Sequence, residues 1–255
     1  MFLDEIASYW DRRADGYSDS IHEEMAGETG RQFRRRLCEA LPVKENEINC
    51  LDIGCGPGFF SMLLASMGHC VTAVDYSREM LEFARQNCAE AGVTVRTVQA
   101  DAQKLPFQDA SFDFICSRNL VWNLENPRQA YEEWFRVLKP GGRFFLFDGN
   151  YYLYYYNDTY RKAREVAVSG KDMEHHIMKG VDPTPIDEIA GSLPLSSKLR
   201  PDWDQAELEQ IGFHIIEIER FFRTFCDQDS GEEKNIVNHF MLLAEKCVEL
   251  ARKEY

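Results

Sequence analysis

Short apolar runs alternate with amphipathic helical patterns through the middle of this 255-residue chain, between residues 47 and 148. Strands that alternate with helices build βαβ units, so the alternation predicts an α/β fold with a mostly parallel sheet. The same pattern resumes after residue 200 and supplies the last strands. The predicted strands are residues 48–53, 70–74, 94–99, 112–116, 143–147, 213–218 and 237–244.

Helix-capping residues mark the segments between these strands. Ser77 is a favourable N-cap, and Asn126 followed by Pro127 is a typical helix start. Residues 204–207 resemble a capping box and predict one further helix that ends near Gly212. The predicted helices of the core are residues 59–67, 78–92 and 127–138.

These patterns divide the chain into four regions. The pattern predicts amphipathic helices in residues 1–45 and the core of the sheet in residues 46–148. Residues 149–200 break the alternation with a tyrosine-rich segment, a helix and a loop, so we expect an inserted cap over one rim that contributes to substrate binding. Residues 201–255 complete the sheet.

Composition argues against several classes of protein. The formal net charge is −14, from 43 acidic and 29 basic residues, whereas nucleic-acid binders usually present basic surface. The basic cluster at residues 31–36 lies among acids, which favours a solvated helix face. No apolar run approaches the roughly 20 residues that a bilayer span needs, and the N-terminus does not resemble a secretory signal. We therefore expect a cytoplasmic protein with no nucleic-acid partner and no membrane span. We also expect it to be a monomer or a homodimer.

The cysteines indicate the same environment. All eight are scattered, without CxxC pairs or paired zinc spacing. Cys50 and Cys116 fall in predicted strand cores, where a reduced thiol behaves as a small hydrophobe. This usage is typical of a reduced cytosolic protein, and we expect no metal site.

A glycine-rich turn is the most specific chemical signal in the chain. Gly54, Gly56 and Gly58 follow the first core strand and precede a helix, and glycine permits the sharp turn and close ligand approach that a Cβ would block. Asp75 ends the next strand about twenty residues later, where a carboxylate can accept hydrogen bonds from both ribose hydroxyls. Together these features predict a nucleotide-like ligand. A dinucleotide is disfavoured, because its third glycine should fall at position 59, which is Phe59.

Successive motifs then resemble those of class I S-adenosylmethionine (SAM)-dependent methyltransferases. They are residues 51–58, Asp75, 99–102, 112–123 and 137–142. Within that superfamily the chain is similar to the small-molecule enzymes of the ubiquinone/menaquinone type. The resemblance covers residues 1–148 and the last two strands. It implies a Rossmann-like, doubly wound sheet of seven strands, the last antiparallel, which binds SAM and releases S-adenosylhomocysteine (SAH).

The resemblance also implies roles for single residues. The glycines lie under the methionine and ribose portions of SAM, Asp75 binds the ribose, Tyr76 flanks the adenine, Asp101 accepts a hydrogen bond from the adenine amino group, and Asn119 lines the methionine end. Taken singly, either aspartate could instead be a cap or turn residue, and Tyr76 could lie on the surface. The expected cofactor-binding residues are Tyr17, Asp52, Gly54, Cys55, Gly56, Gly58, Asp75, Tyr76, Met80, Asp101, Ala102 and Asn119.

The N-terminal segment, residues 9–17, resembles the lid that closes over SAM in this group, which makes residues 1–45 a helical lid. Aromatic rings stabilise a sulfonium cation and exclude water from it. The alternative is a helix docked on the core through Tyr9, Trp10 and Tyr17. Tyr17 is the residue that we expect to touch the cofactor.

Methyl transfer from SAM is an in-line displacement, in which alignment and desolvation supply much of the acceleration. A general base is needed only when the acceptor must lose a proton. The candidate bases are His175 and His176, which could also be ordinary surface or core residues. A shared metal is less favoured, because adjacent helical residues diverge by about 100°.

The expected substrate residues are Trp122, Tyr151, Tyr155 and His175. The tyrosine run at residues 151–156 either lines an aromatic acceptor pocket or packs on the core. The loop at residues 117–122 lacks the Asn/Asp-Pro-Pro-aromatic pattern that the resemblance leads us to expect of base-amino methyltransferases. Two other functions stay open: a non-catalytic SAM-binding or methyltransferase-like partner or sensor domain, and transfer of another group, such as aminopropyl from decarboxylated SAM.

Overall fold

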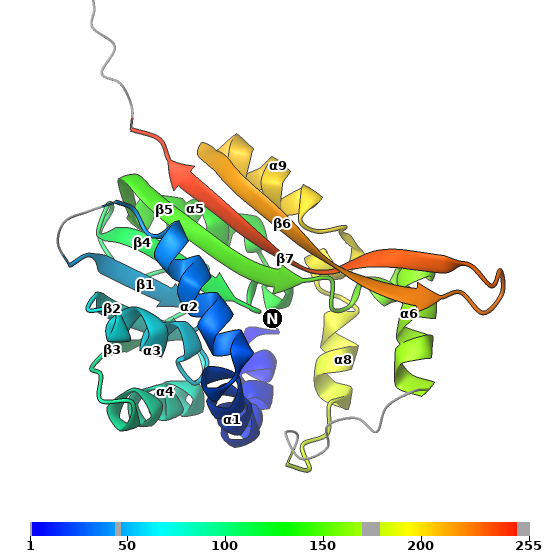
Figure 1. Cartoon of the computed structure of the whole chain (residues 1–255). Helices are drawn as coiled ribbons and strands as arrows, with labels where there is room; N and C mark the ends of the chain where they lie inside the picture. Colours follow the sequence, from blue (N-terminus) through cyan, green and yellow to red (C-terminus); the bar gives the residue numbers. More distant parts are fainter. Residues whose placement is uncertain (1, 44–46, 170–178, 249–255) are drawn as a thin grey trace, which may run out of the picture.

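The computed structural model describes residues 2–43, 47–169 and 179–248. Within these ranges, seven strands form one sheet in the order β3-β2-β1-β4-β5-β7-β6 (Figure 1). They are β1 (Asn49–Ile53), β2 (Cys70–Asp75), β3 (Arg96–Gln99), β4 (Phe112–Arg118), β5 (Leu138–Gly149), β6 (Phe213–Cys226) and β7 (Glu233–Lys246). Strands β1 to β5 pair in parallel, whereas β7 runs antiparallel to both β5 and β6. The predicted mostly parallel sheet with an antiparallel last strand is confirmed.

Helices cover both faces of this sheet. They are α1 (Leu3–Ala26), α2 (Glu28–Ala40), α3 (Phe59–Ser66), α4 (Arg78–Glu90), α5 (Pro127–Val137), α6 (Asp158–Ser169), α8 (Thr184–Ala190) and α9 (Asp202–Ile211), with short 3-10 helices at residues 121–123, 153–155 and 194–197. Helices α2, α3 and α4 pack on one face and α5 and α9 on the other (Figure 1). Trp134 and Phe60, which are both among the largest fully buried side chains, lie on opposite faces. In the described part of the chain, no helix combines the length and apolar character of a bilayer span.

Burial on both faces explains why the strand positions could be predicted. A parallel strand covered by helices on each side must be apolar along its whole length rather than alternating. The residues of β4 are all buried except Arg118 at its carboxyl end. Ser77 caps α4 as expected, because its Oγ accepts a hydrogen bond from Met80 N at 3.1 Å. Asn126 and Pro127 also precede and begin α5, although no side-chain hydrogen bond caps it.

The predicted capping box at residues 204–207 is wrong. Helix α9 begins earlier, at Asp202, with no side-chain cap. Asp204 lies inside the helix without exposed surface and accepts hydrogen bonds from Arg200 and from the hydroxyl of Tyr131, the latter at 2.5 Å. A buried guanidinium competes more strongly for a carboxylate than the backbone N–H groups of a helix start do.

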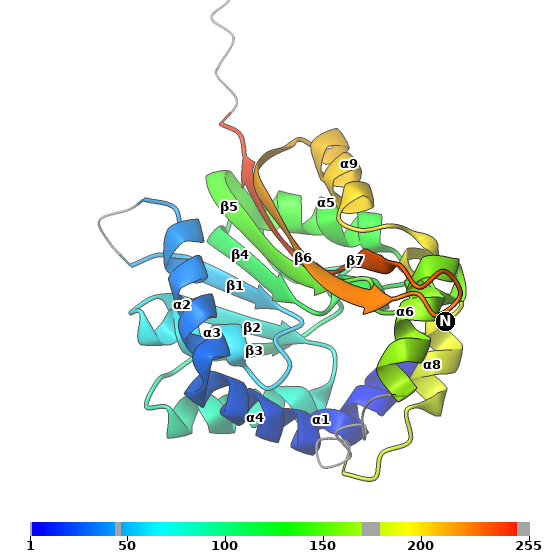
Figure 2. The same cartoon turned by 45° about the vertical axis from the view of Figure 1, so that its right-hand side comes forward.

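Three helices border the carboxyl edge of the parallel strands (Figure 2). Helix α1 packs against α8 through a cluster of apolar side chains that includes Ile6 and Ile186 and also Trp122. The β6–β7 hairpin extends past the other strands and packs against α6, with Phe225 and Tyr160 in the contact. The carboxyl ends of β1 and β4 therefore lie at the edge of the sheet that these helices border.

Candidate functional site

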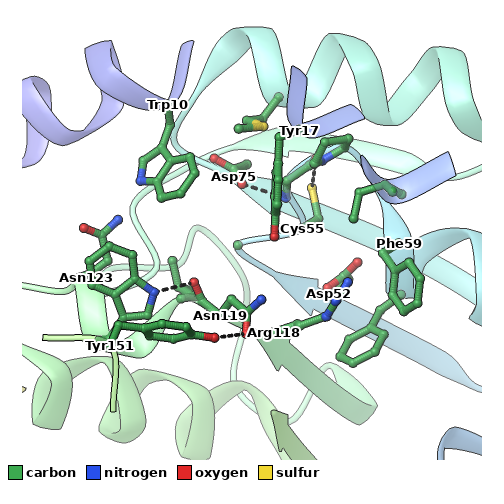
Figure 3. A pocket seen from close by; sticks show the side chains of 18 of the residues that line it. Trp10, Tyr17, Asp52, Cys55, Phe59, Asp75, Arg118, Asn119, Asn123 and Tyr151 are labelled. Atoms are coloured by element: carbon green, nitrogen blue, oxygen red, sulfur yellow. Dashed lines mark hydrogen bonds between the residues drawn. The ribbon is translucent and has the colours of Figure 1, made fainter. Parts of the chain in front are cut away.

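A cavity of about 410 Å3 lies where the strand order reverses, between the carboxyl ends of β1 and β4 (Figure 3). Open α/β sheets bind their ligands at this switch point. A smaller cavity of about 60 Å3 adjoins it at the end of β2. The residues that line both cavities are Trp10, Gly54, Asp75, Leu120 and Asn123.

The glycine turn leaves its backbone open to the larger cavity. Gly54 and Gly56 have positive φ values of +66° and +51°. A Cβ at Gly54 would lie 2.6 Å from the side chain of Leu120, and one at Gly56 would lie 3.4 Å from the ring of Tyr17. Gly58 has a different role, because it lines neither cavity and a Cβ there would lie 3.3 Å from Ala84 of α4.

Asp75 closes one side of this turn. Its Oδ2 accepts a hydrogen bond from Gly56 N and its Oδ1 one from Ser77 N, each at 2.9 Å. Burial raises the pKa of Asp75 to about 6, although these backbone hydrogen bonds oppose the shift. An ionised carboxylate oxygen can accept two hydrogen bonds, so each oxygen can still accept one from a ligand hydroxyl.

The smaller cavity adds three predicted residues to Gly54 and Asp75, which line both cavities. Tyr76, Asp101 and Ala102 all line it. The hydroxyl of Tyr76 donates to Asp4 of α1 at 3.1 Å, and Oδ1 of Asp101 accepts from Gln103 N at 2.9 Å. The smaller cavity lies at the ends of β2 and β3, which is where the resemblance places the adenine.

Helix α1 forms one wall of the site. The hydroxyl of Ser77 donates to Asp11 of α1 at 2.5 Å, and Asn87 of α4 donates to Ser18 at 2.9 Å. These contacts join α1 to α4 and place Trp10 and Tyr17, whose rings are 5.9 Å apart, on the cavity wall. An aromatic wall of this kind suits a lid and a docked helix equally.

Asn119 and Tyr151 shape the opposite wall (Figure 3). Asn119 has a positive φ of +56°, which turns its side chain toward Tyr151, and its Oδ1 accepts the Tyr151 hydroxyl at 2.6 Å. Burial raises the pKa of Tyr151 well above its usual range, so this phenol stays a donor. The indole N–H of Trp122 donates a hydrogen bond to Asn119 O at 2.9 Å. The ring centres of Trp122 and Tyr152 lie 5.1 Å apart.

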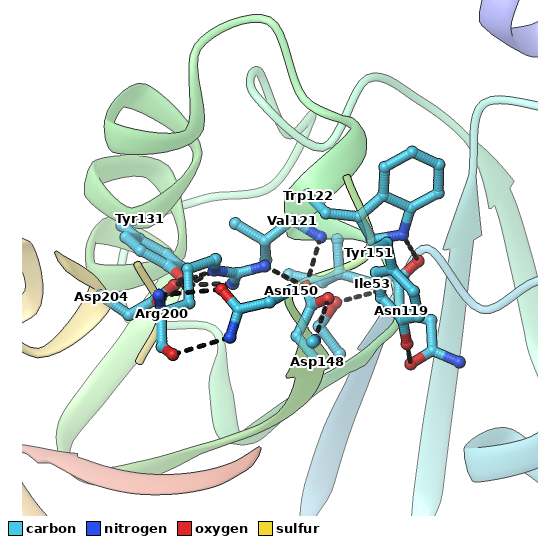
Figure 4. Close-up of polar contacts among 12 residues, drawn as sticks. Ile53, Asn119, Val121, Trp122, Tyr131, Asp148, Asn150, Tyr151, Arg200 and Asp204 are labelled. Carbon is cyan, nitrogen blue, oxygen red and sulfur yellow. Dashed lines mark hydrogen bonds and ion pairs between the residues drawn. The ribbon is translucent and has the colours of Figure 1, made fainter. Parts of the chain in front are cut away.

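A buried ion cluster supports that wall from behind (Figure 4). Arg200 is 1% exposed and pairs with Asp148 and Asp204, both without exposed surface. Asp148, at the end of β5, also accepts a hydrogen bond from Val121 N at 2.9 Å. The cluster thereby fixes the loop that carries Asn119 and Trp122.

Arg118 is a site residue that the sequence analysis missed. It lines the larger cavity, its guanidinium lies 4.3 Å from the centre of the Phe59 ring, and it pairs with Glu24 of α1. Its Nε and Nη1 are buried and have no hydrogen-bond partner in the described part of the chain. Because unpaired buried donors are costly, this arrangement suits an anionic ligand group. The one available signal was a basic residue at the end of an otherwise apolar strand.

Three further predicted residues line the larger cavity: Asp52, Cys55 and Met80. Asp52 accepts the hydroxyl of Ser61 at 2.6 Å, and burial raises the pKa of Asp52 to about 6. Burial also raises the pKa of Cys55 well above its usual range, which disfavours the reactive thiolate.

Tyr155 lies away from the cavities. Its side chain is 47% exposed and its hydroxyl donates to Asp187 O at 3.2 Å. Tyr155 lies in the 3-10 helix at residues 153–155, and Tyr152, which precedes that helix, lines the larger cavity instead. His175 and His176 lie outside the described residues. Within the described ranges, no three His, Cys, Asp or Glu side chains converge as metal ligands would.

Comparison with known proteins gives a family match over the core. The methyltransferase-domain family model matches residues 51–146. The chain is 34% identical over 140 residues to a demethylmenaquinone methyltransferase from Paenarthrobacter aurescens, covering 55% of this chain and 53% of that protein. It is 38% identical over 138 residues to a malonyl-[acyl-carrier protein] O-methyltransferase from Erwinia pyrifoliae, covering 54% and 48%.

The chain spans about half the length of these two relatives, and only 29% of a bifunctional BioHC protein from Cellvibrio japonicus. Among solved structures, a SAM-dependent methyltransferase from Methanosarcina mazei matches with a TM-score of 0.53 and 23% identity, covering 82% of this chain and 96% of that one. At this identity the likeness shows a shared fold.

Proposed function

We propose that this protein is a SAM-dependent methyltransferase with a small-molecule acceptor, because residues 51–146 match the methyltransferase-domain family model and the sheet is that of the class I, Rossmann-like fold. The observation that carries the proposal is the open turn at Gly54 and Gly56, hydrogen-bonded to Asp75 at the switch point of the sheet. A Cβ at either glycine would reduce the space that a ligand needs there.

Each end of the cofactor has a matching group. Asp75 would accept the ribose hydroxyls, and Tyr76 and Asp101 would contact the adenine in the smaller cavity. Arg118 would bind the methionine carboxylate, because it offers two buried donors without partners in the described part of the chain. Bound there, SAM supplies an electrophilic methyl group on a sulfonium sulfur.

The chain's own residues would then exclude water and orient the acceptor. Trp10, Tyr17 and Trp122 present aromatic faces to the cavity, and such faces favour a cation. Tyr151, kept protonated by burial, would donate a hydrogen bond rather than act as a base. Alignment and desolvation supply much of the acceleration of an in-line displacement, so this site needs no further group for an acceptor that carries no labile proton.

Arg118 also bears on the alternative donor, decarboxylated SAM. A ligand without the carboxylate would leave this guanidinium buried against Phe59 without an added anion. The arrangement therefore favours intact SAM and methyl transfer over aminopropyl transfer. A non-catalytic role is disfavoured because the larger cavity, about 410 Å3, extends past Asn119 to Tyr152 instead of being filled by side chains.

Calorimetry with two ligands tests the proposal. We expect SAH to bind the wild-type protein, and Arg118→Met to weaken SAH more than tenfold while changing the affinity for the decarboxylated analogue less than threefold. Arg34→Met, an exposed substitution on α2, is the matched control and should leave both affinities unchanged. Failure of both SAM and SAH to bind at millimolar concentration would contradict the function. Equal losses for the two ligands would contradict only the role of Arg118.

A further inference from the structure

A third cavity, of about 230 Å3, adjoins the larger one at Tyr151. It lies between α6 and the β6–β7 hairpin, and Tyr151 and Arg164 line both cavities. We name it the outer cavity. Its lining residues are Asn150, Tyr151, Tyr154, Tyr160, Arg164, Arg223, Ile236, Asn238 and His239.

The outer cavity carries positive charge without compensating carboxylates. Arg164 comes from α6 and Arg223 from β6, and none of the described lining residues is acidic. Across the described residues, neither arginine forms an ion pair, whereas Arg36 and Arg128 each pair with glutamates. In a chain of net charge −14, two guanidinium groups that lack an ion pair within the described residues thus lie at one cavity.

Tyrosine hydroxyls and arginines make this cavity rich in hydrogen-bond donors. The guanidinium of Arg164 lies 3.8 Å from the centre of the Tyr154 ring, a contact that restricts its orientation. The hydroxyl of Tyr154 is buried and has no partner among the described residues. The hydroxyl of Tyr160 already donates to Val237 O at 3.1 Å. A ligand that brings acceptor oxygens would satisfy the groups that lack partners.

The route toward the cofactor site is aromatic. Beyond Tyr151 the larger cavity is lined by Tyr152 and Trp122, whose rings lie 5.1 Å apart. Such faces suit a flat apolar body. Positive charge therefore lies in the outer cavity, whereas aromatic surface lies nearer the proposed methyl donor.

We propose that the methyl acceptor is an organic anion whose carboxylate or phosphate binds Arg164 and Arg223, with its apolar body extending past Tyr151 toward SAM. This inference rests on the proposed methyltransferase function. Guanidinium groups bind both kinds of anionic oxygen through charge-assisted hydrogen bonds, and two of them give orientation as well as affinity.

Matched acid and amide probes test the charge requirement on SAH-saturated, full-length protein. The probes are benzoate, phenylacetate, 3-phenylpropionate and phenyl phosphate, each acid compared with its amide and the phosphate with phenol, by calorimetry. We expect at least one anion to bind the wild type more than tenfold tighter than its neutral partner. In an Arg164→Met/Arg223→Met double variant the preference should fall below threefold.

The control is Arg161→Met, an exposed residue of α6 that pairs with Asp158 and does not line the outer cavity. It should keep the preference for anions. SAH affinity, measured first on every variant, shows whether the fold and the cofactor site are intact. If SAH binds but no anion is preferred, or if the double variant keeps the preference, the acceptor inference is wrong while the proposed function stands. Absence of SAH binding to the wild type would instead overturn the proposed function.

Discussion

The raised pKa of Asp75 predicts that cofactor binding weakens in mild acid. Burial raises this pKa to about 6 in the free protein. Ribose hydroxyls that donate to the carboxylate favour its charged form, so ligand binding lowers the pKa of Asp75 from this raised value. Affinity is therefore complete above about pH 7, where Asp75 is ionised in both states, and falls as the pH drops through the free-state value.

The size of the effect follows from that single pKa. If the protonated carboxyl does not bind the ribose, the apparent dissociation constant for SAH rises by a factor of about 2 at pH 6 and about 11 at pH 5. The same linkage requires proton release on binding below about pH 6. Isothermal titration calorimetry in two buffers of different ionisation enthalpy measures both quantities.

Asp52 provides the matched control, because burial also raises its pKa to about 6 and it lines the same cavity. Its carboxylate is directed to Ser61, so Asp52→Asn should keep the pH dependence of SAH binding. Asp75→Asn should remove it and weaken SAH at neutral pH. A wild-type affinity that stays constant from pH 8 to pH 5, with circular dichroism showing an intact fold, would refute the reasoning.

Substitutions of Arg200, Gly58 and Tyr17 test the packing, the backbone turn and the aromatic wall separately. Arg200→Met leaves two buried carboxylates unpaired and should lower the free energy of unfolding by about 3–5 kcal/mol in urea titrations; a loss below 1 kcal/mol would count against a buried ion cluster. Gly58→Ala should cost about 1–2 kcal/mol, because φ is +95°, but change SAH affinity less than twofold, and a larger change would place Gly58 in the site. Tyr17→Leu should weaken SAM about 2- to 30-fold more than SAH in the same calorimetric assay, because only SAM carries the sulfonium cation; equal weakening would exclude a cation–π contact.

The positions of the strands along the chain and the glycine turn between β1 and α3 could be predicted because their signals are local. A parallel strand covered on both faces is a continuous apolar run. The turn at Gly54 requires glycines, because the backbone there leaves no room for a Cβ. Asp75 then follows from the end of the next strand. These features depend on a few adjacent residues, so a single sequence contains them.

The residues that the sequence did not reveal depend on distant contacts. Asp204 resembles a helix cap locally, but its partner Tyr131 lies far away in the sequence. Arg118 looks like a surface residue until α1 places Glu24 beside it. Tyr152 lines the cavity wall instead of Tyr155, because the intervening 3-10 helix packs against α6 through Leu153.

The predicted regions of the chain contribute to different parts of the site. Residues 149–200 contribute Tyr151 and Arg164 to the cavities from beyond the core. We propose that these residues form the acceptor-binding cap and that residues 1–45 form the lid, with 46–148 and 201–255 as the core sheet. This division assigns donor binding to the core and acceptor binding to the variable elements at its carboxyl edge, where α/β enzymes generally carry specificity.

The most direct test of the central claim is a calorimetric titration of the full chain with SAH at neutral pH, repeated with Asp75→Ala. The account predicts one binding site per chain and a dissociation constant that the substitution raises more than tenfold. An unchanged dissociation constant, or no heat of binding to the wild type at millimolar SAH, would contradict it.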